Sequence, residues 1–244
     1  MRLVGLSASP ADHLARGVTP EVQSDSLRRI AEAHGMPIDT RVRPRMAGTI
    51  PACRAVVAAR LNAPERAGAV LRGLRVRFVR GELLDEPRTI EHAAADAGLE
   101  AVDLARWIAD EATAATLADD MAAARHPMPA ALVLDGRLAA WEGGRRYTCP
   151  SYEIERLSDG ERIAVPGFQP FAVYEVVMAN LLPDVRRAKP PRCAEEVLRW
   201  AGTPLATKEV AVVRDISVEA AREELGRVAV EEPLGADGLW SLPA

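Results

Sequence analysis

The first half of the chain carries apolar residues at helical spacing. Between residues 51 and 125 they recur every three or four positions, and Pro51, Pro64 and Pro87 stand where a first helical turn tolerates proline. The high alanine content of this stretch favours close helix packing. The pattern predicts a short strand over residues 2–7 and helices over 25–34, with Ser24 as cap, and over 52–61, 64–80, 85–98, 102–110 and 112–125.

Between residues 130 and 165 the pattern becomes that of strands. An apolar run to Leu134, the Asp135-Gly136 pair and residues 137–142 predict a hairpin with a two-residue turn. Pro129 has no amide hydrogen to offer a ladder, so it fits the first residue of this strand, where a cis bond is also tolerated. A second hairpin is predicted over residues 152–157 and 162–165, with a helix over 171–181 after it.

The last quarter of the chain reads as a separate region. Residues 184–193 form a basic, proline-containing linker. Three short helices are predicted after it, over 195–200, 207–213 and 217–227, with Thr207 and Ser217 as caps, and then a hairpin over 228–242. This order resembles a winged helix, a fold that often binds DNA.

Charge argues against a nucleic-acid partner. Residues 194–244 carry ten acidic and five basic side chains, whereas phosphate recognition needs an excess of basic ones. The formal net charge of the whole chain is −4. We interpret Arg41, Arg43, Arg45 and Arg54 as surface charge rather than as an anion site. No apolar run is long enough to cross a membrane, and the apolar run within residues 1–11 is too short for a confident secretory signal, so we expect a cytoplasmic protein without a membrane partner.

Three cysteines and four histidines offer little redox or metal chemistry by themselves. Cys53, Cys149 and Cys193 are widely separated, which argues against a disulfide framework, and no zinc-like spacing occurs. Cys149 is the cysteine of most interest, because neighbouring Arg145 and Arg146 would favour its thiolate. No motif for a phosphate, cofactor or hydrolase site occurs, so we expect neither metal nor cofactor.

Three segments together resemble a known family. They are Ile-Pro-Ala-Cys-Arg-Ala-Val at residues 50–56, the His-Pro-Met-Pro loop at 126–129, and Gly-Phe-Gln-Pro-Phe at 167–171. These residues resemble the DsbA-like, FrnE-type branch of the thioredoxin superfamily. The resemblance implies an α/β thioredoxin-like core at 1–50 and 126–183, lacking its N-terminal strand, and an inserted all-α domain at 51–125. Residues 184–193 would be the linker and 194–244 the winged-helix-like domain.

The resemblance also implies where a partner would bind. In this family a cis-proline loop receives an extended peptide, which points to Met128, Pro129 and Ala130 as substrate-binding residues. The catalytic Cys-x-x-Cys of the disulfide oxidoreductases is absent, so no catalytic residue is assigned and we expect a redox-inactive protein that binds a peptide or protein partner.

Three interpretations of this incomplete core remain open. The protein could be redox-inactive, with a second subunit, either a partner or a copy of itself in a homodimer, covering the exposed core. It could be an active thiol-disulfide oxidoreductase acting on protein thiols, whose N-terminus is missing from this chain. It could also be an interaction adaptor that uses its acidic winged-helix-like domain.

Overall fold

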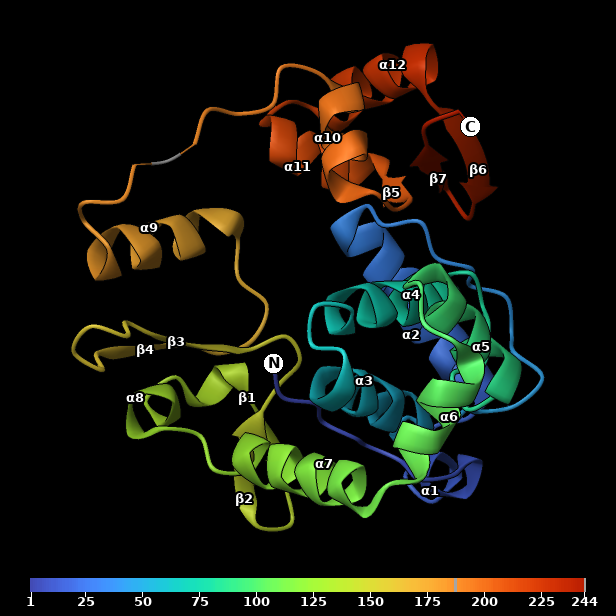
Figure 1. Cartoon of the computed structure of the whole chain (residues 1–244), viewed down its shortest axis with the longest axis vertical. Helices are drawn as coiled ribbons and strands as arrows, with labels where there is room; N and C mark the ends of the chain where they lie inside the picture. Colours follow the sequence, from blue (N-terminus) through green and yellow to red (C-terminus); the bar gives the residue numbers. More distant parts are fainter. Residues whose placement is uncertain (187, 244) are drawn as a thin grey trace. The chain divides into compact units, whose positions relative to one another are not determined.

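The structure is a computed structural model, in which residues 1–186 and 188–243 are described. Figure 1 shows its helices and strands along the chain, and contacts between Cα atoms divide it into two units. Unit 1 consists of Met1–Gly5 and Ala109–Ala188, and unit 2 of Leu6–Ile108 and Lys189–Ala244. Sequence analysis assigned residues 6–50 to a thioredoxin-like core, whereas this division groups them with the helices that follow. The fold boundaries drawn from the sequence therefore stay a prediction.

The first part of unit 2 is helical. Its helices are α1 (Pro10–Leu14), α2 (Pro20–His34), α3 (Ile50–Asn62), α4 (Ala67–Val79), α5 (Pro87–Asp96) and α6 (Ala101–Ala109, which ends at the boundary between the units). The predicted helices between residues 52 and 110 are confirmed. A Cβ atom on Gly73 of α4 would lie 3.3 Å from the Cα atom of Ala93, so this glycine permits α4 and α5 to pack closely.

Two details near the start of unit 2 differ from the predictions. α2 begins earlier than predicted, because Thr19 accepts a hydrogen bond from the amide of Val22 and Pro20 follows it at the first helical position. Ser24, the predicted cap, is buried inside the helix, where its hydroxyl donates to the carbonyl of Thr40 at 2.5 Å. The predicted strand over residues 2–7 is not paired in any sheet that the structure describes.

The second part of unit 2 contains three helices and a small sheet. Its elements are α10 (Ala194–Ala201), β5 (Leu205–Ala206), α11 (Thr207–Arg214), α12 (Val218–Val228), β6 (Val230–Leu234) and β7 (Asp237–Ser241), with the strands in the order β5-β7-β6. The predicted helices and hairpin are confirmed, as is the cap at Ser217, which accepts from the amide of Ala220. Thr207 is not a cap: its hydroxyl accepts from the indole nitrogen of buried Trp240 and donates to Asp237.

One stripe of α4 holds the two parts of unit 2 together. Arg72, Val76 and Arg80 follow one another at four-residue spacing, which places them on the same helix face. Arg72 pairs with Glu209 at the start of α11, and Arg80 pairs with Glu232 of β6. Between them, buried Val76 packs in a cluster of apolar side chains with Ala206 and Leu239, joined by partly buried Met36 and Leu234. The β5-β7-β6 sheet is therefore fixed against α4.

Unit 1 combines helices with two hairpins. Its elements are α7 (Glu111–Ala124), α8 (Pro129–Leu132), a 3-10 turn at Asp135–Arg137, β1 (Leu138–Trp141), β2 (Gly144–Tyr147), β3 (Tyr152–Glu155), β4 (Arg162–Val165) and α9 (Phe171–Leu181). β1 pairs with β2 and β3 pairs with β4, both antiparallel. The second hairpin and α9 are as predicted. The amide of Leu3 donates to Asp120 of α7 at 2.9 Å, which attaches the first residues to this unit.

The predicted strand before Asp135 is wrong. Residues 129–132 form α8 because Pro129 takes the first helical position after extended Met128, and alanines follow it. The Asp135-Gly136 pair lies in the 3-10 turn, and β1 turns back at Glu142-Gly143 to pair with β2. Among the described residues, no helix is long and apolar enough to cross a membrane.

Candidate peptide-binding site

The three residues predicted to contact a peptide form the start of α8. Met128 is extended and partly buried, whereas Pro129 and Ala130 are exposed. The cis peptide bond of the described chain lies elsewhere, between Cys149 and Pro150, so the placement of a cis proline at Pro129 is wrong. The role of residues 128–130 in binding a peptide stays a prediction.

Tyr147 connects this turn to the second hairpin. Its ring is buried with Ala131 and Leu138, and the partly buried side chains of Met128 and Ala164 pack against them. The phenol oxygen accepts a hydrogen bond from the amide of Met128 at 3.2 Å. Because the ring is held in place by burial, its hydrogen bond to the amide of Met128 positions the backbone at the start of α8.

The same phenol takes part in a charged network. Its hydroxyl donates to Glu153 of β3 at 2.6 Å, and the other oxygen of Glu153 accepts from Arg162 at 2.5 Å. Burial, together with the Glu153 hydrogen bond, raises the pKa of Tyr147 to about 12. The phenol is therefore protonated at neutral pH and acts as a structural donor.

The Cys149-Pro150 turn lies between Tyr147 and β3, and its two residues are exposed. Its geometry is held from both sides. The hydroxyl of Ser151 donates to the carbonyl of Thr148 at 2.6 Å and accepts from the amide of Gly167 at 3.0 Å. Both turns, at 128–130 and 149–150, are thus linked through Tyr147 and its neighbours and present their tips to solvent.

Arginines near Cys149 have other partners. Arg145 donates to Asp135 at 2.5 and 2.7 Å, and Arg146 donates to the carbonyl of Tyr147 at 2.9 Å. Both guanidinium groups that the sequence places near Cys149 therefore donate hydrogen bonds to other acceptors. Cys149 belongs to unit 1, whereas Cys53 and Cys193 belong to unit 2, and none of the three is in a disulfide.

Large apolar side chains are exposed throughout unit 1. Next to the two turns, the exposed fraction is 83% for Val133 and 58% for Phe168. The apolar helix α9 has a single buried residue, Leu181. Further exposed members are Leu132, Leu134, Trp141, Tyr152, Leu157, Phe171, Val176, Met178 and Val185. Large apolar side chains exposed in this number within a folded unit favour a site for another polypeptide.

The arginines that sequence analysis treated as surface charge have specific partners. Arg41 pairs with Asp39, and Arg45 pairs with Asp85 at 2.8 Å. Arg43 is buried rather than exposed, and the interpretation is wrong for this residue: it stacks on the ring of Phe78, at 4.4 Å from its centroid, and donates to the Phe78 carbonyl. Burial lowers the pKa of Arg43, against the effect of nearby Asp39. Across residues 1–186 and 188–243, no cluster of three or more metal-ligating side chains occurs.

Sequence reasoning missed Tyr147 and Glu153, which organise this region. Tyr147 is the last residue of β2 and lies opposite Leu138 in the β1–β2 register, whereas sequence analysis predicted no strand at this position. Nothing in the local pattern indicates that its hydroxyl reaches residue 128, nineteen positions earlier.

Comparison with known proteins supports the fold alone. A candidate protein disulfide isomerase from Nitrosomonas europaea has a similar structure, with a TM-score of 0.51 and 16% sequence identity. The match covers 68% of this chain and 76% of that protein. No protein-family model and no curated protein sequence matches the chain. The match supports a likeness of fold to that protein, and the assignment to the FrnE-type branch of the thioredoxin superfamily stays a prediction.

Proposed function

We propose that this protein binds extended segments of other proteins through unit 1 and does so without two-cysteine redox chemistry. The contact surface consists of the turns at 128–130 and 149–150 together with the apolar side chains beside them. The observation that carries this proposal is the exposure of large apolar side chains next to two turns that Tyr147 links. Likeness to a candidate disulfide isomerase supports it, because such proteins act on other polypeptides.

Redox chemistry by the usual route has no residues to perform it in this sequence. Thiol-disulfide exchange needs a nucleophilic thiolate and a second thiol that resolves the mixed disulfide. None of Cys53, Cys149 and Cys193 has another cysteine three positions away. Binding is therefore the activity that the described residues support.

The test measures binding of a permanently unfolded chain, reduced and carboxymethylated α-lactalbumin, by titration calorimetry with the full chain. Val133→Lys places a charge on an 83% exposed apolar position and should weaken binding by about tenfold. The matched control is Val102→Lys on α6, where the exposed fraction is 75% and no effect is expected. Equal affinities for both variants and the wild type would refute the proposal.

A second candidate function rests on a different exposed side chain. Trp200, at the end of α10, is 81% exposed, and an aromatic ring in this setting is typical of interaction surfaces. We propose as the alternative that α10–β7 is a winged-helix-like adaptor for another protein. Its arginines support a protein rather than a nucleic-acid partner, because Arg199, Arg214, Arg222 and Arg227 each pair with a carboxylate.

The same calorimetric titration separates the two functions. Trp200→Ser should leave binding of the unfolded chain unchanged if unit 1 is the site. If Trp200→Ser abolishes binding while Val133→Lys does not, the adaptor function replaces the first. Val230→Ser, at a 59% exposed position of β6, controls for a nonspecific loss of surface apolarity.

A further inference from the structure

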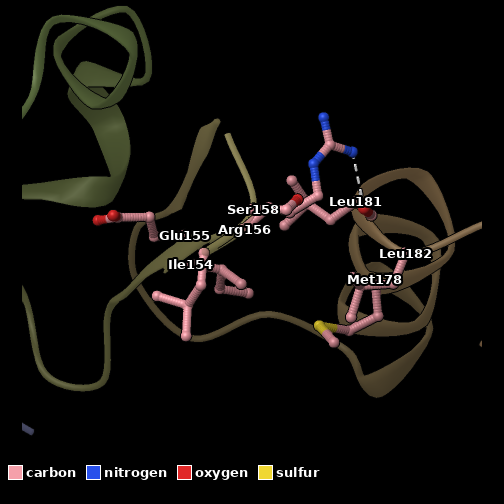
Figure 2. Close-up of a pocket in the computed structure, with 8 residues that line it drawn as sticks. Ile154, Glu155, Arg156, Ser158, Met178, Leu181 and Leu182 are labelled. Carbon is pink, nitrogen blue, oxygen red and sulfur yellow. Dashed lines mark hydrogen bonds between the residues drawn. The ribbon is translucent and has the colours of Figure 1, made fainter. Parts of the chain in front are cut away.

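A pocket of about 410 Å³ lies between the second hairpin and the last turn of α9 (Figure 2). Five of its eight lining residues are apolar: Ile154 and Leu157 from the hairpin, and Met178, Leu181 and Leu182 from the end of α9. Figure 2 shows Met178 extending from the helix toward the hairpin, where Ile154 lines the other side of the pocket. The volume lies in the range of ligand-binding pockets, and none of residues 128–130 or 149–150 lines it.

Arg156 holds the two walls of this pocket at a fixed separation. Its guanidinium donates to the carbonyl of Leu181 at 2.8 Å, which satisfies a carbonyl at the C-terminal end of α9. The same group donates to Asp159 at 2.6 Å and also to Glu161. This hydrogen bond joins the hairpin to the end of α9 at one edge of the apolar pocket.

The mouth of the pocket is apolar where a surface is usually polar. Leu157, at the start of the β3–β4 turn, is 91% exposed, and Met178 is 41% exposed. An apolar side chain that entered the pocket would cover both Leu157 and Met178, and removing their apolar surface from water would favour binding. An open rim of this kind suits a side chain that arrives on another polypeptide better than a small molecule, which requires a more enclosed site.

The second hairpin, which supplies one wall of the pocket, carries a net negative charge. The hairpin from Tyr152 to Val165 contains four carboxylates and two arginines. Arg156 is occupied by Asp159 and Glu161, and Arg162 pairs with Glu153 and Glu155. The hydrogen bonds from Arg156 hold the pKa of Asp159 at about 2, so this carboxylate stays charged at physiological pH. No cation of the hairpin remains available to attract an acidic partner.

The backbone beside the pocket can accept a strand. β3 and β4 form a two-stranded sheet, so one edge of β3 is not paired with any strand that the structure describes. Such an edge accepts an extended peptide through main-chain hydrogen bonds, while alternate side chains enter neighbouring pockets.

We propose that this pocket binds one large aliphatic side chain of an extended, basic segment of a partner protein, which adds to the edge of β3. Each carboxylate of the hairpin already pairs with an arginine, and Glu153 also pairs with Arg2 at 3.8 Å, so it is the remaining net negative charge of the hairpin that favours lysine or arginine near the anchoring side chain. A second copy of this chain fits less well, because a symmetric contact would bring two acidic hairpins together. This site shares no residue with the two turns of the proposed function and does not depend on them.

The test uses the full chain and three labelled, cysteine-free peptides in fluorescence anisotropy titrations. Lys-Thr-Leu-Thr-Arg carries the anchor and the basic flanks, Glu-Thr-Leu-Thr-Glu reverses the charge, and Lys-Thr-Ser-Thr-Arg lacks the anchor. We expect the first to bind and the other two to bind at least about tenfold more weakly. Met178→Gln, similar in size and polar, should weaken binding of the first peptide by about fivefold. Val176→Gln, on the same helix at a 61% exposed position outside the pocket, should not.

Each other outcome would overturn the proposal. Equal binding of the acidic peptide would show that the partner segment is not selected for basic residues. Equal effects of Met178→Gln and Val176→Gln would show that the anchoring side chain does not bind in the pocket. A dimer in sedimentation experiments that Met178→Gln dissociates would assign the pocket to a second copy. Uptake of an apolar dye that none of the peptides displaces would assign it to a small molecule. Val133→Lys, which tests the proposed function, should leave binding of the first peptide unchanged, so failure of one proposal is distinguishable from failure of the other.

Discussion

Arg72 of α4 offers the sharpest test of how unit 2 is held together. Its guanidinium donates to both carboxylate oxygens of Glu209, at 2.6 and 2.8 Å, and to the carbonyl of Pro204 at 2.5 Å. Both charged side chains are about one quarter exposed. Arg72→Met keeps the apolar stem of the side chain and removes all three hydrogen bonds. It leaves Glu209 with the amide of Ala206, which donates to it at 2.9 Å.

Three effects determine the size of the loss. Charge-assisted hydrogen bonds contribute about 1.5–3 kcal/mol, but neighbouring bonds are not additive and partial exposure weakens the pair. In the opposite direction, the buried Nε atom of Arg72 has no hydrogen-bond partner among the described residues, and its removal recovers about 1 kcal/mol. We therefore expect Arg72→Met to lower the free energy of unfolding by about 2 kcal/mol and the midpoint of thermal unfolding by about 4–8 °C.

Urea unfolding, followed by tryptophan fluorescence, measures this loss. The control is Arg106→Met, which removes an exposed ion pair with Asp103 within one helix and should cost less than about 0.5 kcal/mol. A double-mutant cycle with Glu209→Gln isolates the pairwise contribution. Equal losses for Arg72→Met and Arg106→Met would show that α4 does not hold α11 as the structure describes.

Three further substitutions test other parts of the structure. Trp240→Phe removes the buried hydrogen bond to Thr207, 2.9 Å long, and should lower the free energy of unfolding by about 1–2 kcal/mol in urea titrations; an unchanged midpoint would contradict the contact. Tyr147 has its pKa raised to about 12, so it should contribute stability that is complete below about pH 10 and lost between about pH 10 and 12; the tyrosinate absorbance of Tyr147→Phe should lack the latest step of the wild-type titration. Gly235→Ala should lower stability by about 1–3 kcal/mol, because φ is 60° there and a Cβ atom would lie 2.6 Å from the carbonyl oxygen of Ile38; calorimetric melting at wild-type temperature would refute this.

The elements that the sequence predicted well are those with local physical signals. Pro51 and Pro87 occupy first helical turns, and Ser217 caps α12. Alternation and the Ser-Asp-Gly turn revealed the hairpin of β3 and β4. The four apolar residues before Asp135 are ambiguous, because a short apolar run fits a strand or a helix. Pro129 at the first helical position and the alanines after it favour the helix that the structure shows.

The contacts that shape the candidate sites were beyond local patterns. Arg72 and Glu209 are 137 positions apart, and no periodicity connects them. The pocket takes one wall from residues 154–158 and the other from 178–182, so its existence depends on how the hairpin meets α9. The family resemblance indicated the turn at residues 128–130. Only the structure shows that Tyr147 accepts a hydrogen bond from the amide of Met128 and so positions this turn.

Hydrogen–deuterium exchange of the full chain, with and without the unfolded α-lactalbumin probe, tests most directly whether unit 1 binds other polypeptides. Binding at the proposed site should slow exchange in residues 128–134 and 148–152 and leave α3 and α4 of unit 2 unchanged, because amides covered by a bound chain exchange less. Slower exchange confined to α10–β7, with none in unit 1, would contradict the proposed function and favour the adaptor.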